Sequence, residues 1–212
     1  MLNKYYTVKE SGSHEISIQK SRFIGYVSRV HSEDEAQSFI QSIKKQHHNA
    51  THNCSAYIIG DRDEIQKNND DGEPGGTAGV PMLEVLKQQS LKNTAVVVTR
   101  YFGGIKLGAG GLIRAYSTTT SETIKHVGIV KGELMQGYAM TIAYPILGKK
   151  ENALEHSPHI VENKEYTENV TLTVYVHIDA QETFEEEMIN LTNNEVELVQ
   201  IQQKYVETTV ES

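Results

Sequence analysis

The stretch TRYFGGIKLGAGGLIRAYS, residues 99–117, constrains the fold more than any other part of the sequence. Five glycines stand between Gly103 and Gly111, shortly after the apolar run AVVV. Each interior glycine costs about 0.5–1 kcal/mol of folding entropy relative to alanine, so a cluster is kept where the backbone needs a positive φ or where another group comes close. The run NTAVVVTRYF before it is typical of a strand buried on both faces. The stretch therefore predicts a strand, a glycine-rich turn and a long helix that begins near Ala109.

Periodicity and capping signals predict the other elements of the first 131 residues. Alternation in HEISIQKSRFIGYVSRV predicts two strands, and THNCSAYIIG predicts another. Ser32 and Glu35 have capping-box spacing ahead of a helix with one apolar face. Residues 68–81 are too rich in Gly, Asp, Asn and Pro for regular structure and predict a loop, after which Pro81 opens a helix.

Beyond Gly132 the pattern predicts a second, smaller domain. Strands are expected at YAMTIAY, HIVENKEY, VTLTVYVHI and EVELVQIQQKYV. One helix is expected to open at Pro145, and another at the capping-box pair Thr183 and Glu186. The order βαββαβ is that of a ferredoxin-like sandwich. We therefore expect an α+β chain with domains at 1–132 and 133–212.

Charge is distributed unevenly along the 212 residues, whose formal net charge is −8. Residues 1–131 carry 16 Lys and Arg against 13 Asp and Glu, which gives +3, whereas residues 132–212 carry 4 against 15, which gives −11. This asymmetry predicts different electrostatic roles for the two domains. The first half tolerates a phosphate-bearing partner, and the second repels one.

Cysteine usage and hydropathy restrict the environment. The single cysteine, Cys54, excludes an intramolecular disulfide, and no stretch is typical of a signal peptide or a membrane span. We expect a cytoplasmic protein with no membrane partner.

The glycine-rich turn, residues 103–111, has the composition of an anion site. A strand that leads through glycines into a helix directs backbone N–H groups and the helix dipole toward one point. Arg100, Lys106 and Arg114 surround the turn, and Glu122 is the single acid in residues 94–125. Anion or nucleic-acid binding is one interpretation, and tight packing of helix on sheet is the other. The spacing fits neither a Walker loop nor a dinucleotide fingerprint, so we expect no ATP, no NAD and no other cofactor.

Two further groups of residues have alternative interpretations. In the acidic loop DDGEPGGTAG, residues 70–79, Asp70, Asp71 and Glu73 with Thr77 are candidates for Mg²⁺ binding, for capping the next helix, or for a solvated turn, and we expect no metal. His52 and Cys54 share a face of a predicted strand, which admits a zinc or nucleophilic site. No second pair completes a zinc set, so we expect a buried cysteine with a hydrogen-bonded histidine.

The blocks ATHNCSAY, DDGEPGGTAG and VVVTRYFGGIKLGAGGLIRAYS resemble the signatures of the IMPACT/YigZ family, and the likeness covers nearly the whole chain. The resemblance implies an N-terminal two-layer α/β domain similar to domain IV of elongation factor G, followed by a ferredoxin-like domain similar to domain V. The motif positions that it carries over are His52, Asn53, Cys54, Asp70, Asp71, Glu73, Pro74, Thr77, Ala78, Gly79, Arg100, Tyr101, Phe102, Gly103, Gly104, Lys106 and Arg114.

The resemblance also implies a function. The eukaryotic member of the family regulates translation by interfering with activation of a kinase of a translation initiation factor, and bacterial members are thought to bind nucleic acid or ribosomes. We therefore expect a non-catalytic protein that contacts RNA or ribosomes through Arg100, Lys106 and Arg114, with Tyr101 and Phe102 as stacking groups. The acidic C-terminal domain would orient the protein or engage a protein partner.

Two alternatives stay open. An enzyme acting on a phosphorylated small molecule would use the acidic loop for metal binding or acid/base chemistry and the glycine-rich turn for the phosphate. It requires that the loop and the turn meet in space. A regulator that binds only protein requires no chemistry from either motif.

Overall fold

The computed structural model describes residues 2–145, 157–193 and 195–210. It divides into two compact units, each built on an antiparallel sheet with helices, so the fold is α+β. The first unit comprises the chain up to Gly132 together with the chain end from Thr208, and the second comprises Glu133–Glu207. Among the described helices, none is long and apolar enough to cross a membrane.

The first unit is organised around a five-stranded sheet in the order β2-β3-β6-β4-β5. Its strands are β2 (Gly12–Ile18), β3 (Ser21–Arg29), β4 (His52–Ile59), β5 (Ile65–Asn69) and β6 (Thr94–Tyr101). All four pairings along this order are antiparallel. A further strand, β1 (Lys4–Val8), pairs with β7 (Ile129–Ile142). The sequence signals did not predict β1 or β5, and β5 takes Asn68 and Asn69 from the expected loop.

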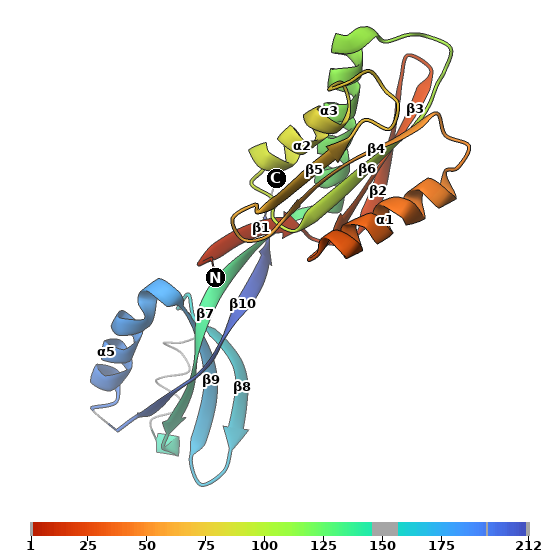
Figure 1. The fold of residues 1–212 in the computed structure, drawn as a ribbon. Helices are drawn as coiled ribbons and strands as arrows, with labels where there is room; N and C mark the ends of the chain where they lie inside the picture. The colour runs from red at the N-terminus through yellow and green to blue at the C-terminus, as the bar shows by residue number, and fades with distance from the viewer. Residues whose placement is uncertain (1, 146–156, 194, 211–212) are drawn as a thin grey trace. The chain divides into compact units, whose positions relative to one another are not determined.

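Helices cover both faces of this sheet (Figure 1). Helix α1 (Glu33–Gln46) packs on one face, and helices α2 (Gly79–Gln88) and α3 (Gly108–Val127) pack on the other. In β6, Val96 and Val98 belong to the core with α2 and α3, while Ala95 and Val97 belong to the core with α1. The expected two-layer arrangement is therefore wrong, because a strand apolar on both faces needs cover on both.

The sequence signals for helix starts and caps agree with the structure at some helices and not at others. Ser32 Oγ accepts a hydrogen bond from Glu35 N at 3.2 Å, as the capping box predicts, and α3 begins at Gly108, one residue from the expected start. Helix α2 begins at Gly79 instead of Pro81. The predicted cap at Thr183 is wrong, because a 3₁₀ turn leads directly into α5 (Gln181–Leu191), which has no side-chain cap.

In the second unit, strands β7, β8 (Ile160–Tyr166), β9 (Val170–His177) and β10 (Glu197–Thr209) form a sheet in the order β10-β7-β9-β8. Apolar residues that alternate along β7 and β9 pack against Phe184 and Met188 of α5. The helix expected to open at Pro145 falls on residues 146–156, which lie outside the described part of the chain.

Candidate functional site: a cleft beside the glycine-rich turn

The sheet register brings two of the sequence motifs together. His52, the first residue of β4, is paired with Arg100, next to the end of β6. The acidic loop connects β5 to α2, and the glycine-rich turn connects β6 to α3. Because β4 lies between β5 and β6, the loop and the turn both lie near the same end of the sheet.

Asp70 organises the acidic loop from inside. Its carboxylate accepts hydrogen bonds from the backbone N–H groups of Gly76 at 2.8 Å, Ala78 at 3.1 Å and Gly79 at 2.8 Å. Burial alone would raise the pKa of Asp70, but these three amides outweigh it and lower the pKa below its ordinary value. Asp70 thus caps the start of α2, one of the roles expected for the loop.

Asp71 and Thr77 fasten the same loop to its surroundings. The Asp71 carboxylate accepts hydrogen bonds from Lys44 Nζ at 2.6 Å and from the backbone N–H of Asn53 at 2.7 Å. Burial would raise the pKa of Asp71, but these bonds to its charged form lower it. Thr77 Oγ1 donates to the carbonyl of Pro74 at 2.7 Å. These groups are engaged in holding the loop.

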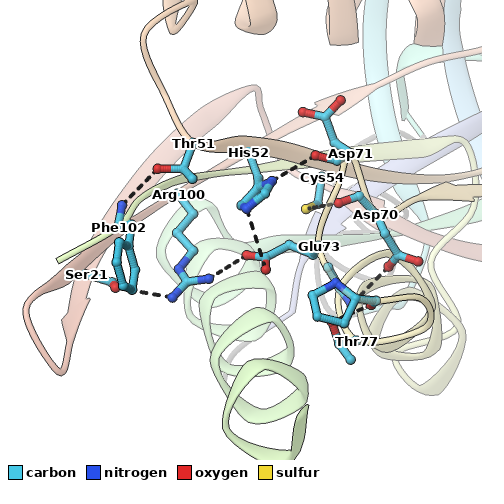
Figure 2. A network of polar contacts seen from close by, with 12 residues as sticks. Ser21, Thr51, His52, Cys54, Asp70, Asp71, Glu73, Thr77, Arg100 and Phe102 are labelled. Atoms are coloured by element: carbon cyan, nitrogen blue, oxygen red, sulfur yellow. Dashed lines mark hydrogen bonds and ion pairs between the residues drawn. The ribbon is translucent and has the colours of Figure 1, made fainter. Parts of the chain in front are cut away.

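Glu73 is the one acid of the loop that turns into the protein, and its side chain is 3% exposed. Its Oε1 accepts hydrogen bonds from Arg100 Nη1 and from Tyr116 Oη, each at 2.7 Å. Its Oε2 lies 3.7 Å from His52 Nε2. Figure 2 shows Glu73 between His52 and Arg100. Glu73 therefore neutralises a buried guanidinium, and removing one partner of such a pair leaves an uncompensated buried charge.

His52 and Cys54 point toward the acidic loop. His52 Nδ1 lies 2.9 Å from the carbonyl oxygen of Asp71. Because a carbonyl oxygen only accepts, Nδ1 carries a proton and donates this hydrogen bond. The Cys54 thiol, completely buried, donates to the carbonyl of Asp70 at 3.0 Å. Burial raises the pKa of this thiol, which makes it a poor nucleophile. The expectation of a buried cysteine beside a hydrogen-bonded histidine is confirmed.

Asn53 and Tyr101 also have structural partners. The Asn53 side chain accepts from Thr99 Oγ1 at 2.7 Å and donates to the His47 carbonyl at 3.3 Å. Tyr101, half-buried at the end of β6, has its hydroxyl 2.9 Å from His47 Nδ1. Neither side chain lines the cleft described below.

The glycines of the turn serve two purposes. A Cβ on Gly103 would lie 2.0 Å from the carbonyl oxygen of Lys20, so this glycine admits the backbone of the β2–β3 hairpin. Gly104, in contrast, has a φ of +86° and nothing within 4 Å of a Cβ. Packing thus explains the first glycine, and backbone conformation explains the second.

Phe102, which directly precedes the glycine-rich turn, is an exposed aromatic group at 47% exposure. Its backbone N–H donates to Thr51 Oγ1 at 3.0 Å, and its ring lies 5.4 Å from the guanidinium carbon of Arg100. Figure 2 shows the ring beside that guanidinium. Lys106 and Arg114 are exposed. Arg100 differs from them because it is only 5% exposed.

The acidic loop and the glycine-rich turn meet at a cleft of about 450 Å³. Its walls are Thr51, His52, Glu73, Pro74, Arg100, Phe102, Lys106, Leu107, Gly108, Ala109 and Leu112. Asp70, Asp71 and Arg114 are not among them. The cleft thus joins one buried ion pair, one exposed aromatic ring and the start of α3. Within the described residues no group of three His, Cys, Asp or Glu is placed to hold a metal ion.

Sequence reasoning missed Tyr116, Thr51 and Leu107. Tyr116 lies within the helix predicted to begin near Ala109, and it is completely buried. A buried tyrosine hydroxyl needs a hydrogen-bond partner, which was the available signal for a polar group such as Glu73 beneath the helix. No signal in the sequence marks Thr51 or Leu107.

Comparison with known proteins places this arrangement in a family. A family model described as the Impact N-terminal domain matches residues 19–124, and a domain of unknown function (DUF1949) matches residues 140–195. The chain is 56% identical over 210 residues to IMPACT family member YvyE of Bacillus subtilis (strain 168), covering 99% of this chain and 97% of that protein. The chain belongs to the IMPACT family. This confirms the resemblance seen in the three sequence blocks.

Other IMPACT family members extend the comparison. IMPACT family member YigZ of Escherichia coli (strain K12) is 30% identical over 188 residues, covering 88% of this chain and 92% of that protein. A crystal structure described as that of a hypothetical protein superposes with a TM-score of 0.60 at 27% identity and covers 95% of this chain and 99% of its own. The two-unit α+β architecture is therefore shared with a solved structure.

Proposed function

We propose that this IMPACT family protein is a cytoplasmic RNA-binding module that acts in translation without catalysis, and that its contact surface is the rim of the cleft. The observation that carries the proposal is that exposed Phe102 and Lys106 stand beside the start of α3, which has no acid in its first turn. Single-stranded RNA is bound by aromatic stacking combined with basic groups. The net charge of +3 for residues 1–131 supports this choice.

Binding is favoured over catalysis because the candidate acid/base groups are already engaged. Asp70 and Asp71 bind backbone amides and Lys44, and Glu73 binds Arg100 and Tyr116. An enzyme acting on a phosphorylated small molecule is the second candidate. It is favoured by one observation, that Glu73 and the glycine-rich turn line the same cleft.

The second unit fits a ferredoxin-like domain that engages a protein partner. The strand order β10-β7-β9-β8, with α5 packed against the sheet, supports the ferredoxin-like assignment. The charge of −11 for residues 132–212 disfavours RNA as the ligand of this unit and favours a basic protein surface. Similarity of the first unit to domain IV of elongation factor G stays a prediction.

The test is a titration of the purified protein with a single-stranded RNA oligonucleotide at about 50 and 200 mM salt, read by fluorescence anisotropy. Phe102→Ala should weaken binding about 5- to 150-fold, because stacking on one aromatic ring contributes about 1–3 kcal/mol. Lys106→Ala should weaken binding and reduce the salt slope by about one. Cosedimentation with ribosomes at the same two salt concentrations repeats the test on the larger target.

Lys125→Ala is the matched control, because Lys125 is also exposed but lies at the opposite end of α3. It should leave the affinity within about twofold of the parent, as expected for a distant surface substitution. Arg100 is unsuitable for this test, since its burial means that Arg100→Ala would also disturb the fold. Equal binding by the parent, Phe102→Ala and Lys106→Ala would refute the proposal.

A further inference from the structure

Arg100 has a hydrogen-bonding group that the fold leaves without a partner. Its Nη1 donates to Glu73 at 2.7 Å and its Nη2 to Ser21 Oγ at 3.5 Å, whereas its Nε is buried and has no hydrogen-bond partner in the described part of the chain. Leaving a buried N–H of a charged group unpaired is costly. Arg100 lines the cleft, and the orphaned Nε shows that the fold does not complete the hydrogen bonds of its guanidinium.

The start of α3 supplies a second set of donors to the same cleft. Leu107, Gly108 and Ala109 line it, and neither a side-chain cap nor an acidic residue occupies the first turn of this 20-residue helix. The first N–H groups of a helix have no partner within the helix, and the helix dipole makes them attractive to an anion. The first residues of α3 and Arg100 line the same cleft, so both groups of donors belong to one candidate site.

The charge of the cleft walls fits a ligand of low negative charge. Glu73 and Arg100 cancel each other as an ion pair, and Lys106 adds one positive charge. Glu73 is the single acid among the lining residues. A phosphate group accepts several N–H donors at once, which matches a guanidinium N–H together with helix amides.

The other walls indicate what the phosphate is attached to. Pro74, Phe102, Leu107 and Leu112 present apolar surface within the cleft. A volume of about 450 Å³ lies within the range of small-molecule pockets. A planar base next to a phosphate would therefore be covered by the same walls, with Phe102 available for stacking.

We propose that the cleft is a built site for the phosphate group of one nucleotide, held by the Arg100 guanidinium and the first amides of α3. The inference deepens the proposed function, on which it rests for RNA as the source of the nucleotide. The phosphate chemistry is shared by a free nucleotide, and the experiment separates the two sources.

The test uses Ala109→Asp, which places a carboxylate at the cleft wall. Ala109 is exposed, and an acid in the first turn of a helix is favourable for the helix, so the variant should fold. Ala109→Asn is the matched control of equal size without the charge. Unchanged circular dichroism and unfolding midpoints of both variants establish that the fold is intact.

The probes are inorganic phosphate and adenosine 5′-monophosphate by titration calorimetry, and each is then used to compete with the RNA oligonucleotide. We expect both probes to bind the parent, and Ala109→Asp to bind at least tenfold more weakly, equivalent to about 1.4 kcal/mol. Ala109→Asn should stay within about threefold, since the helix amides remain available. Displacement of RNA by the monophosphate would support both the site and the RNA source.

Other outcomes separate the two proposals. Nucleotide binding that Ala109→Asp abolishes, in a protein that does not bind RNA, supports the phosphate site with a free nucleotide as ligand and refutes the proposed function. RNA binding that neither probe displaces and that Ala109→Asp leaves unchanged refutes the phosphate site and leaves the proposed function standing. Absence of binding by both probes to the parent also refutes the site.

Discussion

The acidic loop and the glycine-rich turn line the same cleft and are both rich in glycine, but their polar groups are used differently. In the acidic loop, the carboxylates of Asp70 and Asp71 accept hydrogen bonds from backbone amides of the protein itself. At the glycine-rich turn, the first turn of α3 has no capping side chain and no acid. The carboxylates of the loop are thus satisfied internally, whereas no side chain caps the helix that follows the turn. Composition alone does not distinguish these two uses of glycine.

The largest effect should come from breaking the ion pair that joins the two regions. Glu73→Ala should destabilise the protein by about 3–5 kcal/mol, because Arg100 would be left buried without a counter-charge. The free energy of unfolding in urea measures this. Glu84→Ala, which breaks the half-exposed pair with Lys87, is the control and should cost less than about 1 kcal/mol. Equal losses for the two variants would contradict the role assigned to Glu73.

A smaller effect should distinguish glycines that are packed from those that are open. Gly103→Ala should cost about 1–3 kcal/mol, because its Cβ would overlap the backbone of Lys20 and Ser21. Gly75 in the acidic loop has nothing within 4 Å of a Cβ, so Gly75→Ala should change stability by less than about 1 kcal/mol. Thermal unfolding of the two variants side by side makes the comparison, and a tolerated Gly103→Ala would refute the close approach.

The smallest effect concerns the cap at the start of α2 and depends on pH. Asp70→Ala should lose about 0.5–2 kcal/mol near neutral pH, because the amides of Gly76, Ala78 and Gly79 lose their acceptor. The pKa of Asp70 is lowered in the folded state, so the unfolded chain binds the proton more readily. The contribution of Asp70 is therefore complete above the ordinary pKa of about 4 and is lost as the pH falls through the lowered value.

Urea unfolding of the parent and Asp70→Ala at about pH 7 and about pH 3 checks this sign. The stability difference between the two proteins should be smaller at the lower pH. Asp71 has a lowered pKa as well but is present in both proteins, so its own pH dependence cancels in the comparison. A difference that grows on acidification would contradict the capping role.

Several features followed from the sequence because their causes are local. Capping at Ser32 depends on a residue three positions away, and burial of β6 on both faces follows from its unbroken apolar run. The strand, glycine-rich turn and helix from Thr94 to Val127 were predicted for the same reason. The family was also evident from contiguous blocks of sequence.

The tertiary structure decided what the motif residues do, because their partners are distant in the chain. Glu73 meets Arg100 and Tyr116 across 27 and 43 positions, so local spacing does not pair these residues. From the sequence, Arg100 and Lys106 are grouped as residues that contact RNA. In the structure Arg100 is buried and ion-paired with Glu73, so the two residues have different roles. Residue types and local spacing determined the helices and strands. The packing of the loop and the turn at one end of the sheet determined which buried polar groups have hydrogen-bond partners within the protein.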